Sequence, residues 1–335
     1  MKIIVPMAGR GSRMRPHTLT VPKPLLPIAG KPIVQRLVED IVGVCGQSVD
    51  EVAFVIGDFG DSVEKALIAV AEKEGAKGSV YHQTQPLGTA HAILCAAESL
   101  SGPVVVAFAD TLFRADFVLD TSTDGVIWTK KVDDPRQFGV VKKNEDGFIT
   151  DFVEKPAEFV SDEAIIGIYY FKDGENLRKE LQYLIDNNIQ DKGEYQLTNA
   201  LENMKNKNLK FRSGTVSDWM DCGNKNITVD TNSRILEFIK DKETLVASSV
   251  QNENSTIHPP CFIGENVVLR NSNIGPGVSI GPGTTIESST ISNSIIGEST
   301  HVSNFNLNNS MIGNHVKMDG NYTNLSIGDY STLEK

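Results

Sequence analysis

The stretch KIIVPMAGRGSRMRP, residues 2–16, joins a short apolar run to a glycine-rich loop that contains three arginines. The apolar run predicts a buried β-strand. A glycine-rich turn after the first strand of an α/β domain brings backbone N–H groups close to a phosphate, because glycine has no Cβ to hold the ligand away. The formal net charge of the chain is -11, so this positive charge is local. Together with Lys23, we expect Arg13 and Arg15 to bind an extended polyphosphate.

Two common phosphate-binding motifs do not match this loop. A dinucleotide-binding turn needs a third glycine where this chain has Met14, and an acidic residue about 20 positions further on that this chain lacks. A Walker loop needs Gly-Lys-Ser or Gly-Lys-Thr, and the sequence GRGSR at residues 9–13 offers neither. The loop therefore belongs to another class of phosphate site.

The first part of the chain, from Met1 to about Phe238, alternates β-rich runs with helical patterns, as βαβ units around a mainly parallel sheet do. The expected strands are residues 2–5, 51–56, 79–83 and 104–110, and the expected helices are 32–44, 61–75 and 88–100. Further strands at 125–132, 138–143, 148–155 and 164–171, followed by helices at 174–188 and 194–206, predict that the sheet widens and becomes mixed. Because residues 104–108 are apolar throughout, both faces of the sheet should be covered.

The tail from Ile257 onward has a different rhythm, in which turns of Asn, Ser, Gly and Pro separate single aliphatic residues. Aliphatic residues recur at intervals of five or six at Ile274, Ile280, Ile286, Ile291 and Ile296. This spacing predicts a parallel β-helix, in which each coil stacks its aliphatic residues on those of the previous coil. Recurring Gly and Pro argue against an α-helix, and the regular aliphatics argue against the alternative of a disordered Asn- and Ser-rich tail.

The tail also aligns with itself. Segments that begin at Asn271, Asn293, Asn309 and Asn324 share the pattern of Asn or Ser before an aliphatic residue and Gly. The step from Ser294 to Ser310 is sixteen residues, whereas the step from Ser272 to Ser294 is twenty-two. We interpret the longer step as one repeat plus an extra hexad.

Length and composition set the remaining limits. At 335 residues the chain exceeds the usual single domain of roughly 100–200 residues, so we expect a domain at 1–238, a linker at 239–256 and a β-helix at 257–335. No run approaches about 18 apolar residues, and the four cysteines lie far apart without a CxxC pair, which favours a cytoplasmic protein with reduced thiols. The acidic balance disfavours nucleic acid and anionic membranes as partners.

Residues 9–33 resemble the signature of the sugar-1-phosphate nucleotidylyltransferases, G-x-G-[ST]-R-[LM]-x-P followed by K-P-[LM]-x-P and K-P-[ILM]. The longer glucose-1-phosphate thymidylyltransferases, which carry a left-handed β-helix tail, are the most similar members. The resemblance implies a Rossmann-like mixed-sheet catalytic domain followed by a left-handed parallel β-helix of hexapeptide repeats. Met7 and Arg10 depart from the loop LAGGxGTR that is frequent in this family.

The resemblance also implies a nucleotide site. Ala8, Gly9, Gly11 and Ser12 would line the phosphate loop, Arg13 would contact the triphosphate, and Lys23 would stabilise the phosphoryl group under attack. In HQTQPLGTAHAI, residues 82–93, the side chain of Gln83 would pair with a pyrimidine edge, and Gly88 would donate its backbone N–H beside Thr89. Gln83 favours dTTP or UTP, since guanylyltransferases more often have an acid there.

A metal site and an acceptor site follow from the same resemblance. Asp110 and Asp221 would hold Mg²⁺ between phosphate oxygens, a ligand set that suits this ion. The sugar phosphate would meet a second group of residues: Gly139, Glu154, Lys155, Gly167 and Glu194. Arg13, Lys23 and Asp110 are the expected catalytic residues.

Structural roles remain possible for each residue alone. Arg15 could pair with a surface acid, Asp110 could cap its loop, Asp221 could anchor a turn, and Glu154 with Lys155 could form a solvated pair. His91 is expected to be packed rather than catalytic, and His17 has no evident acidic partner in the sequence.

The predicted reaction is attack of a sugar-1-phosphate oxygen on the α-phosphorus of a nucleoside triphosphate, with pyrophosphate leaving in line. One alternative is a hexapeptide-repeat sugar acyltransferase, or a bifunctional enzyme, with His301 or His315 as its histidine. Another is a binding-only homologue. We expect a homo-oligomer, with the tail serving assembly.

Overall fold

The structure of the chain is a computed structural model that describes every residue except 10, 116–117, 321–324 and 334–335. Its contacts divide the chain into two units. Unit 1 comprises residues 1–9 and 35–219, and unit 2 comprises residues 10–34 and 220–335. The phosphate loop is thus divided: Ala8 and Gly9 belong to unit 1, whereas Gly11 and the residues that follow belong to the same unit as the β-helix. The predicted division at residues 238 and 257 follows the repeat pattern and stays a prediction.

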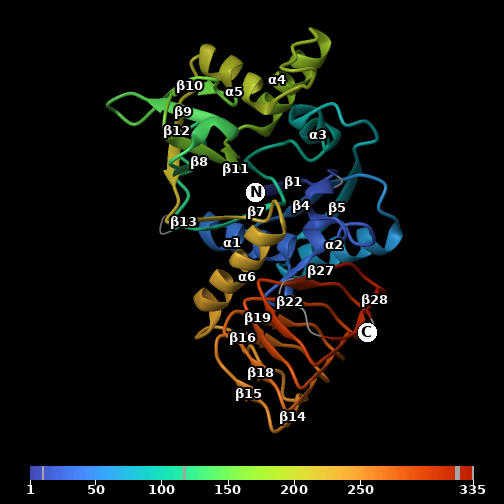
Figure 1. The fold of residues 1–335 in the computed structure, drawn as a ribbon. Helices are drawn as coiled ribbons and strands as arrows, with labels where there is room; N and C mark the ends of the chain where they lie inside the picture. The colour runs from blue at the N-terminus through green and yellow to red at the C-terminus, as the bar shows by residue number, and fades with distance from the viewer. Residues whose placement is uncertain (10, 116–117, 321–324, 334–335) are drawn as a thin grey trace. The chain divides into compact units, whose positions relative to one another are not determined.

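Unit 1 is built on a nine-stranded mixed sheet, which confirms the predicted Rossmann-like domain (Figure 1). The central strands β6, β1, β4 and β5 run parallel, and β11 runs antiparallel to β6, β8 and β9. The strands of this sheet are β1 (Lys2–Pro6), β4 (Glu51–Ile56), β5 (Lys77–His82), β6 (Val104–Ala107), β8 (Gly125–Lys131), β9 (Val140–Lys143), β10 (Ile149–Val153), β11 (Glu163–Phe171) and β12 (Phe211–Thr215).

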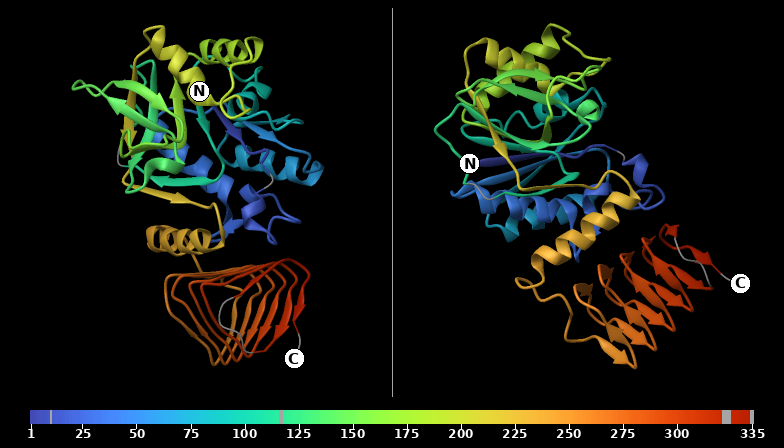
Figure 2. Two further views of the ribbon diagram at one scale, coloured as in Figure 1. Left: turned by 45° about the horizontal axis from the view of Figure 1, so that its top comes forward. Right: turned by 60° about the vertical axis from the view of Figure 1, so that its left-hand side comes forward.

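Helices cover both faces of this sheet, as the apolar strands predict. Every residue of β4 and β6 is buried. Figures 1 and 2 show α1 (Ile33–Cys45) and α2 (Asp61–Lys73) on one side, and α3 (Thr89–Cys95), α4 (Gly174–Asp186) and α5 (Leu197–Asn206) on the other. The core on the second side joins apolar residues of α3, α4 and α5 to alternate residues of the strands. Sequence analysis did not predict the short elements β7 (Thr111–Arg114), η3 (Pro135–Gln137), β12 and β13 (Asp218–Asp221).

Unit 2 begins with the arginine-rich segment 10–34, which has little regular structure. It contains two 3-10 turns and a two-stranded antiparallel ribbon: η1 (Ser12–Met14), η2 (Lys23–Leu25), β2 (Pro27–Ile28) and β3 (Lys31–Pro32). Helix α6 (Lys225–Ile239) follows and was not predicted. Its buried face includes Thr228, Thr231 and Asn232, so the apolar period that marks a helix is weak. The side chain of Asn224 begins the helix by accepting a hydrogen bond from the backbone N–H of Ile227.

The tail forms three parallel sheets that wind around a common apolar core, which confirms the predicted left-handed β-helix (Figure 2). The isoleucines predicted to point inward are buried. One sheet contains β14 (Gln251–Glu253), β17 (Val268–Arg270), β20 (Thr285–Glu287), β23 (His301–Ser303), β26 (Lys317–Asp319) and β28 (Thr332–Leu333). The second contains β15 (Thr256–Ile257), β18 (Asn273–Ile274), β21 (Thr290–Ser292) and β24 (Asn306–Asn308), and the third β16 (Cys261–Ile263), β19 (Val278–Ile280), β22 (Ile295–Ile296), β25 (Met311–Ile312) and β27 (Ser326–Ile327).

The strand register corrects the predicted alignment of the repeats. Ile274 pairs with Ile291, and Ile280 pairs with Ile296. The coil that begins near Ser272 is therefore followed by one that begins near Ser289, rather than at Ser294, and no extra hexad is inserted. The alignment from sequence was wrong because two of the three sheets carry Ser before an aliphatic residue. A strand of one sheet can therefore be aligned with a strand of the neighbouring sheet without changing the sequence pattern.

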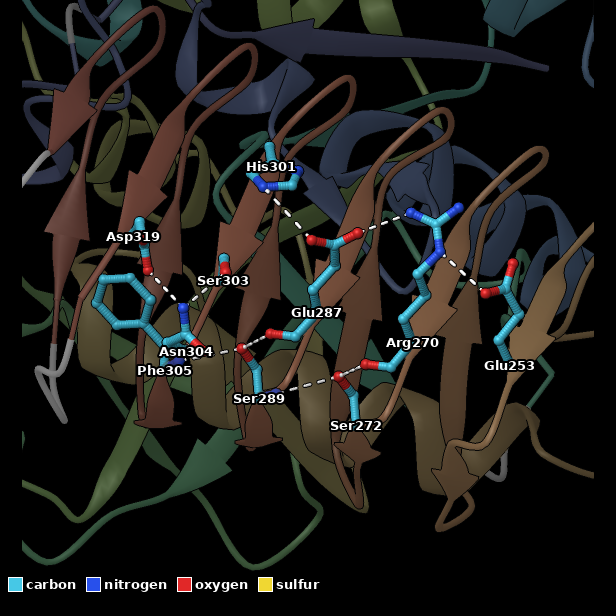
Figure 3. A network of polar contacts seen from close by, with 10 residues as sticks. All are labelled: Glu253, Arg270, Ser272, Glu287, Ser289, His301, Ser303, Asn304, Phe305 and Asp319. Atoms are coloured by element: carbon cyan, nitrogen blue, oxygen red, sulfur yellow. Dashed lines mark hydrogen bonds and ion pairs between the residues drawn. The ribbon is translucent and has the colours of Figure 1, made fainter.

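Small polar residues hold the corners and one outer face of the β-helix. Asn271, Ser288 and Asn304 occupy the left-handed backbone region that Asn adopts readily. At the next corner the hydroxyl of Ser272 accepts from the N–H of Ser289 at 3.1 Å, one coil further on (Figure 3). On the outer face, Arg270 lies between Glu253 and Glu287 on neighbouring coils, with hydrogen bonds of 3.0 and 2.7 Å (Figure 3).

One buried amide joins the three parts of unit 2. The side chain of Asn232 on α6 is fully buried. Its Oδ1 accepts from the backbone N–H of Ala29 at 2.9 Å and from the hydroxyl of Ser279 at 2.7 Å. Its Nδ2 donates to the carbonyl of Gly277 at 3.2 Å. The segment 10–34, helix α6 and the β-helix are thus joined by hydrogen bonds to a single side chain.

Within the part of the chain that the structure describes, none of the helices has the length and hydrophobicity to span a bilayer.

Replacing Asn232 by alanine should lower the free energy of unfolding by about 2–5 kcal/mol, because the N–H of Ala29, the hydroxyl of Ser279 and the carbonyl of Gly277 would each lose a buried hydrogen bond. Denaturant titration followed by circular dichroism measures the change. The matched control is Glu237→Ala on the exposed side of the same helix, which should change the free energy by less than about 0.5 kcal/mol. Equal stability of the two variants would contradict the role given to Asn232.

Candidate functional site

The phosphate loop of unit 2 turns at Gly11, whose φ of 59° lies in the left-handed region. The hydroxyl of Thr18 donates to the carbonyl of Gly11 at 2.8 Å. A Cβ at position 11 would lie only 2.9 Å from Cβ of Lys23, so the glycine lets η2 approach the loop. The structure therefore brings Gly11 and Lys23 together, as the polyphosphate prediction requires.

The predicted loop residues differ in exposure. Ser12, Arg13 and Arg15 are exposed, whereas Met14 and Lys23 are buried. Within the described residues, neither Arg13 nor Arg15 pairs with a carboxylate, so the surface-pair alternative for Arg15 has no support there. Both guanidinium groups are therefore available to an anionic ligand.

The back of this loop contacts the last coil of the β-helix. His17 is 3 % exposed, and its Nε2 lies 3.1 Å from the hydroxyl of Ser326. The hydroxyl of Thr20 donates to the carboxylate of Asp329. Burial lowers the pKa of His17 to about 4, although the charge of Asp329 opposes the shift. His17 is thus a neutral residue that anchors the loop from behind.

A cavity of about 500 Å³ lies between residues 17–30 and the third sheet of the β-helix. Its walls include aliphatic side chains such as Leu25 and Met311, and the carboxylates of Glu265, Glu298 and Asp329. Because none of the described residues that line it is a lysine or an arginine, this cavity does not suit a triphosphate.

In unit 1, the predicted base-recognition segment surrounds the start of α3. Gln83 directly follows β5, and its Nε2 donates to the carbonyl of Gly88 at 3.2 Å. Gly88 has a φ of 109°, and a Cβ there would lie 2.5 Å from the carbonyl oxygen of Tyr195. Only glycine therefore fits at position 88. Two backbone hydrogen bonds connect the segments around Gly88 and Tyr195. The N–H of Tyr195 donates to the carbonyl of Leu87, and the N–H of Ala90 donates to the carbonyl of Tyr195, both at 2.9 Å.

The chain that enters α5 lies along this segment. The hydroxyl of Thr89 accepts from the N–H of Leu197 at 2.9 Å and donates to the side-chain carbonyl of Gln196 at 3.1 Å. The side-chain amide of Gln196 donates to Glu194 at 2.9 Å. Glu194, predicted for the sugar phosphate, is therefore adjacent to the base segment.

Three other predicted acceptor residues lie together. Glu154 Oε2 accepts from the hydroxyl of Thr198 at 3.1 Å, and Glu154 Oε1 is 3.5 Å from Nζ of Lys155. A Cβ at Gly139 would lie 3.1 Å from Glu154 Oε2. The backbone N–H of Lys155 donates to the carbonyl of Phe138 at 3.2 Å, which holds residues 138–139 beside 154–155.

Thr198 connects the two groups. It belongs to the first turn of α5, directly after the residues that contact Gly88 and Thr89. The segment Glu194–Thr198 therefore borders both the base group and the acceptor group. Tyr169 of β11 is buried, and burial together with the charge of Glu154 raises its pKa, so its hydroxyl stays protonated.

The two aspartates predicted for a metal ion follow strand ends. Asp110 lies in the turn between β6 and β7, two residues after Phe108, whose N–H donates to the carbonyl of Gly167 at 3.0 Å. Gly167 has a φ of 86° at an irregularity of β11. Asp221 is the last residue of β13 in unit 2, and its backbone carbonyl accepts from the hydroxyl of Thr231 at 3.0 Å. Ala8 and Gly9 directly follow Met7, which continues the pairing of β1 with β4.

Several contributing residues were missed by sequence analysis. Gln196 and Thr198 follow Glu194 closely in the chain but were not singled out, and only their contacts indicate a role. His91 is half-buried, and its Nδ1 lies 3.1 Å from Nε2 of Gln83. Its place three residues after Gly88, one helical turn into α3, was the one available signal.

The two histidines considered for acyl transfer have structural contacts. His301 lies 4.0 Å from Glu287 on the outer face of the coils (Figure 3). The ring of His315 stacks on Tyr330 with centroids 4.7 Å apart. The described residues contain no cluster of three His, Cys, Asp or Glu side chains that could ligate a metal ion.

Comparison with known proteins identifies the family. Residues 2–237 match the family model described as "Nucleotidyl transferase", so the chain belongs to this family. Glucose-1-phosphate thymidylyltransferase of Streptomyces griseus is 26% identical over 361 residues, which cover 100% of this chain and 99% of that protein. The predicted resemblance to the sugar-1-phosphate nucleotidylyltransferases is thereby confirmed, and the chain is an enzyme of the nucleotidyltransferase class.

One further relative and one solved structure are similar to this chain. The bifunctional protein GlmU of Methanococcus vannielii is 28% identical over 274 residues, 80% of this chain and 62% of that protein. A solved structure, UDP-glucose pyrophosphorylase complexed with UDP-glucose, has a TM-score of 0.59 and 24% identity, covering 71% of this chain and 98% of that chain. This likeness shows the fold.

The buried neutral His17 predicts a pH dependence of stability. Because the folded state holds the pKa near 4 and the unfolded chain has a pKa near 6.5, protonation favours unfolding. The free energy of unfolding should be constant with respect to His17 above pH 6.5 and fall by up to about 3 kcal/mol as the pH drops toward 4. Denaturant titrations at several pH values measure this.

The variant His17→Gln should lack this loss between pH 6.5 and 4, while the decline from carboxylates at lower pH persists. Identical pH profiles of the variant and the natural chain would show that His17 is not the group responsible.

Proposed function

We propose that this chain transfers a nucleotidyl group from dTTP or UTP to a sugar-1-phosphate, releasing pyrophosphate. The observation that carries the proposal is the segment Glu194–Thr198, which borders the base group around Gln83 and Gly88 and also the acceptor group around Glu154. A nucleotide base and a sugar phosphate bound to these groups would lie on neighbouring parts of one unit.

The chemistry is a direct displacement at phosphorus. An oxygen of the sugar-1-phosphate forms a bond to the α-phosphorus, and the bond from that phosphorus to the oxygen leading to the β-phosphate breaks. Pyrophosphate leaves with the electron pair. No general base is needed, because a phosphate monoester is already anionic at neutral pH. The obstacle is the approach of two polyanions, which fixed cations overcome by neutralising charge and fixing geometry.

Three cations are assigned to this role. Arg13 would contact the triphosphate, Lys23 the phosphoryl group under attack, and Lys155 the acceptor phosphate. The exposed guanidinium of Arg13 and the approach of Gly11 to Lys23 support the first two assignments. Glu154, held by Thr198, would accept hydrogen bonds from sugar hydroxyls. Gly139 and Gly167 leave room for the sugar, since neither carries a side chain.

Mg²⁺ belongs to this proposal, with Asp110 and Asp221 as its ligands. Two carboxylates at strand ends suit this ion, which usually takes one or two carboxylates and completes its shell with water and phosphate oxygens. When bound, the ion would neutralise charge on the phosphate oxygens. The proposal also includes a cytoplasmic homo-oligomer, and the four cysteines, which form no disulfide with one another, suit that location.

The experiment incubates the purified chain and Mg²⁺ with each nucleoside triphosphate and a panel of sugar-1-phosphates, and it measures pyrophosphate release. Acetyl-CoA consumption is measured in parallel, because it tests the acyltransferase alternative. Pyrophosphate release that depends on both substrates is the expected result. Its absence with every pair would overturn the proposal.

Neutral variants of the loop cations should lose activity without losing the fold. We expect Arg13→Ala and Lys23→Met each to lower kcat by about 100-fold or more, since each removes a charge that stabilises the transition state. Lys31→Met is the matched control in the same segment, because Lys31 pairs with Glu243, and it should keep kcat within threefold. Normal pyrophosphate release by both loop variants would contradict the assignment.

A further inference from the structure

The side chain of Gln83 is held by two neighbours within unit 1. Its Nε2 lies 3.2 Å from the carbonyl oxygen of Gly88 and 3.1 Å from Nδ1 of His91. His91 belongs to the first turn of α3, which begins directly after Gly88. Gln83 extends the pairing of β5 with β4, because its backbone N–H donates to the carbonyl of Ile56 at 2.8 Å. The side-chain amide is thus held at its Nε2 end, and the backbone of Gln83 is held by β4.

These contacts decide which way the amide points. A backbone carbonyl can only accept a hydrogen bond, so the atom facing Gly88 must be the NH₂ group of Gln83. Its second hydrogen is directed to Nδ1 of His91, which must accept and therefore carries no proton. His91 is then neutral with its proton on Nε2. Burial lowers the pKa of His91, which favours this neutral form.

The orientation leaves Gln83 with one free function toward a ligand. Both amide hydrogens are occupied within the protein, and Oε1, on the other side of the amide carbon, is an acceptor only. An acceptor pairs with N3–H of uracil or thymine. It is repelled by N3 of cytosine, which is itself an acceptor.

We propose that His91 is a positioning residue that locks the Gln83 amide with Oε1 toward the nucleobase, and thereby selects uracil or thymine over cytosine. This inference rests on the proposed function, because it assigns the base specificity of the same site. A site built around one hydrogen bond discriminates strongly against a base that cannot make it, since the acceptor in the site is then left unsatisfied.

The test compares two substitutions of similar size. His91→Asn keeps an acceptor near the place of Nδ1, whereas His91→Leu removes it. For each we would measure kcat and KM with UTP, dTTP and CTP at a fixed sugar-1-phosphate. His82→Leu is the matched control, because His82 precedes Gln83 but pairs with Glu64 on the surface at 3.3 Å.

The natural chain and His82→Leu should both prefer UTP or dTTP to CTP in kcat/KM. His91→Leu should reduce that preference at least tenfold, mainly by raising KM for UTP and dTTP, with kcat changed less than threefold. His91→Asn should retain the preference within threefold. An unchanged preference in His91→Leu, or an equal loss in His91→Asn, would overturn the inference, since the second result would mean that His91 acts by packing alone.

A second measurement uses the natural chain and does not depend on the folding of a variant. Long-range ¹H–¹⁵N correlation spectra of the histidine rings should show His91 neutral with its proton on Nε2, with the assignment taken from the signal missing in His91→Asn. A proton on Nδ1 would overturn the inference even if nucleotidyl transfer is observed. Absence of transfer with every triphosphate would instead overturn the proposed function, and the tautomer would still be measurable.

Discussion

The buried amide of Asn232 is the contact on which unit 2 depends. The segment 10–34 carries the predicted phosphate loop from Gly11 onward, yet the regular elements of its described residues, 11–34, are two 3-10 turns and two strands of two residues, so it cannot form a core of its own. Asn232 fixes it at Ala29 and binds Gly277 and Ser279 of the β-helix at the same time. The contacts of His17 with Ser326 and of Thr20 with Asp329 add a second attachment at the last coil. The segment that carries most of the phosphate loop is therefore attached to the β-helix at its last coil and, through Asn232, at Gly277 and Ser279.

In unit 1, the candidate residues come from strands and helices that are far apart in the chain. The segment Glu194–Thr198 gathers them through short contacts to Gly88, Thr89 and Glu154. Close approach is possible only because position 88 has no Cβ, so the glycine is required for packing and for its φ of 109°. These hydrogen bonds order the polar groups before a ligand binds, which reduces the conformational entropy lost on binding.

The charge distribution of the chain favours anion binding at the arginine-rich loop. The chain carries a net charge of -11, which opposes nonspecific binding of anions, while Arg13 and Arg15 remain exposed on the loop and without carboxylate partners in the described part of the chain. The cavity between the loop segment and the β-helix has mostly apolar walls with three carboxylates, so it does not compete for a triphosphate. A polyphosphate would therefore be attracted to one place on the protein.

Sequence alone determined the βαβ layout, the β-helix, the glycine-rich loop and the residue types of the candidate site. These are local patterns, and hydrophobic periods or short motifs report them directly. Tertiary structure decided the pairing of Ile274 with Ile291, the burial of the polar face of α6, and the partners of Asn232 and Gln83. The physical reason is that each of these depends on groups brought together from distant parts of the chain, where a buried polar atom must find a partner. The periodicity of the sequence does not predict which partner a buried polar atom has.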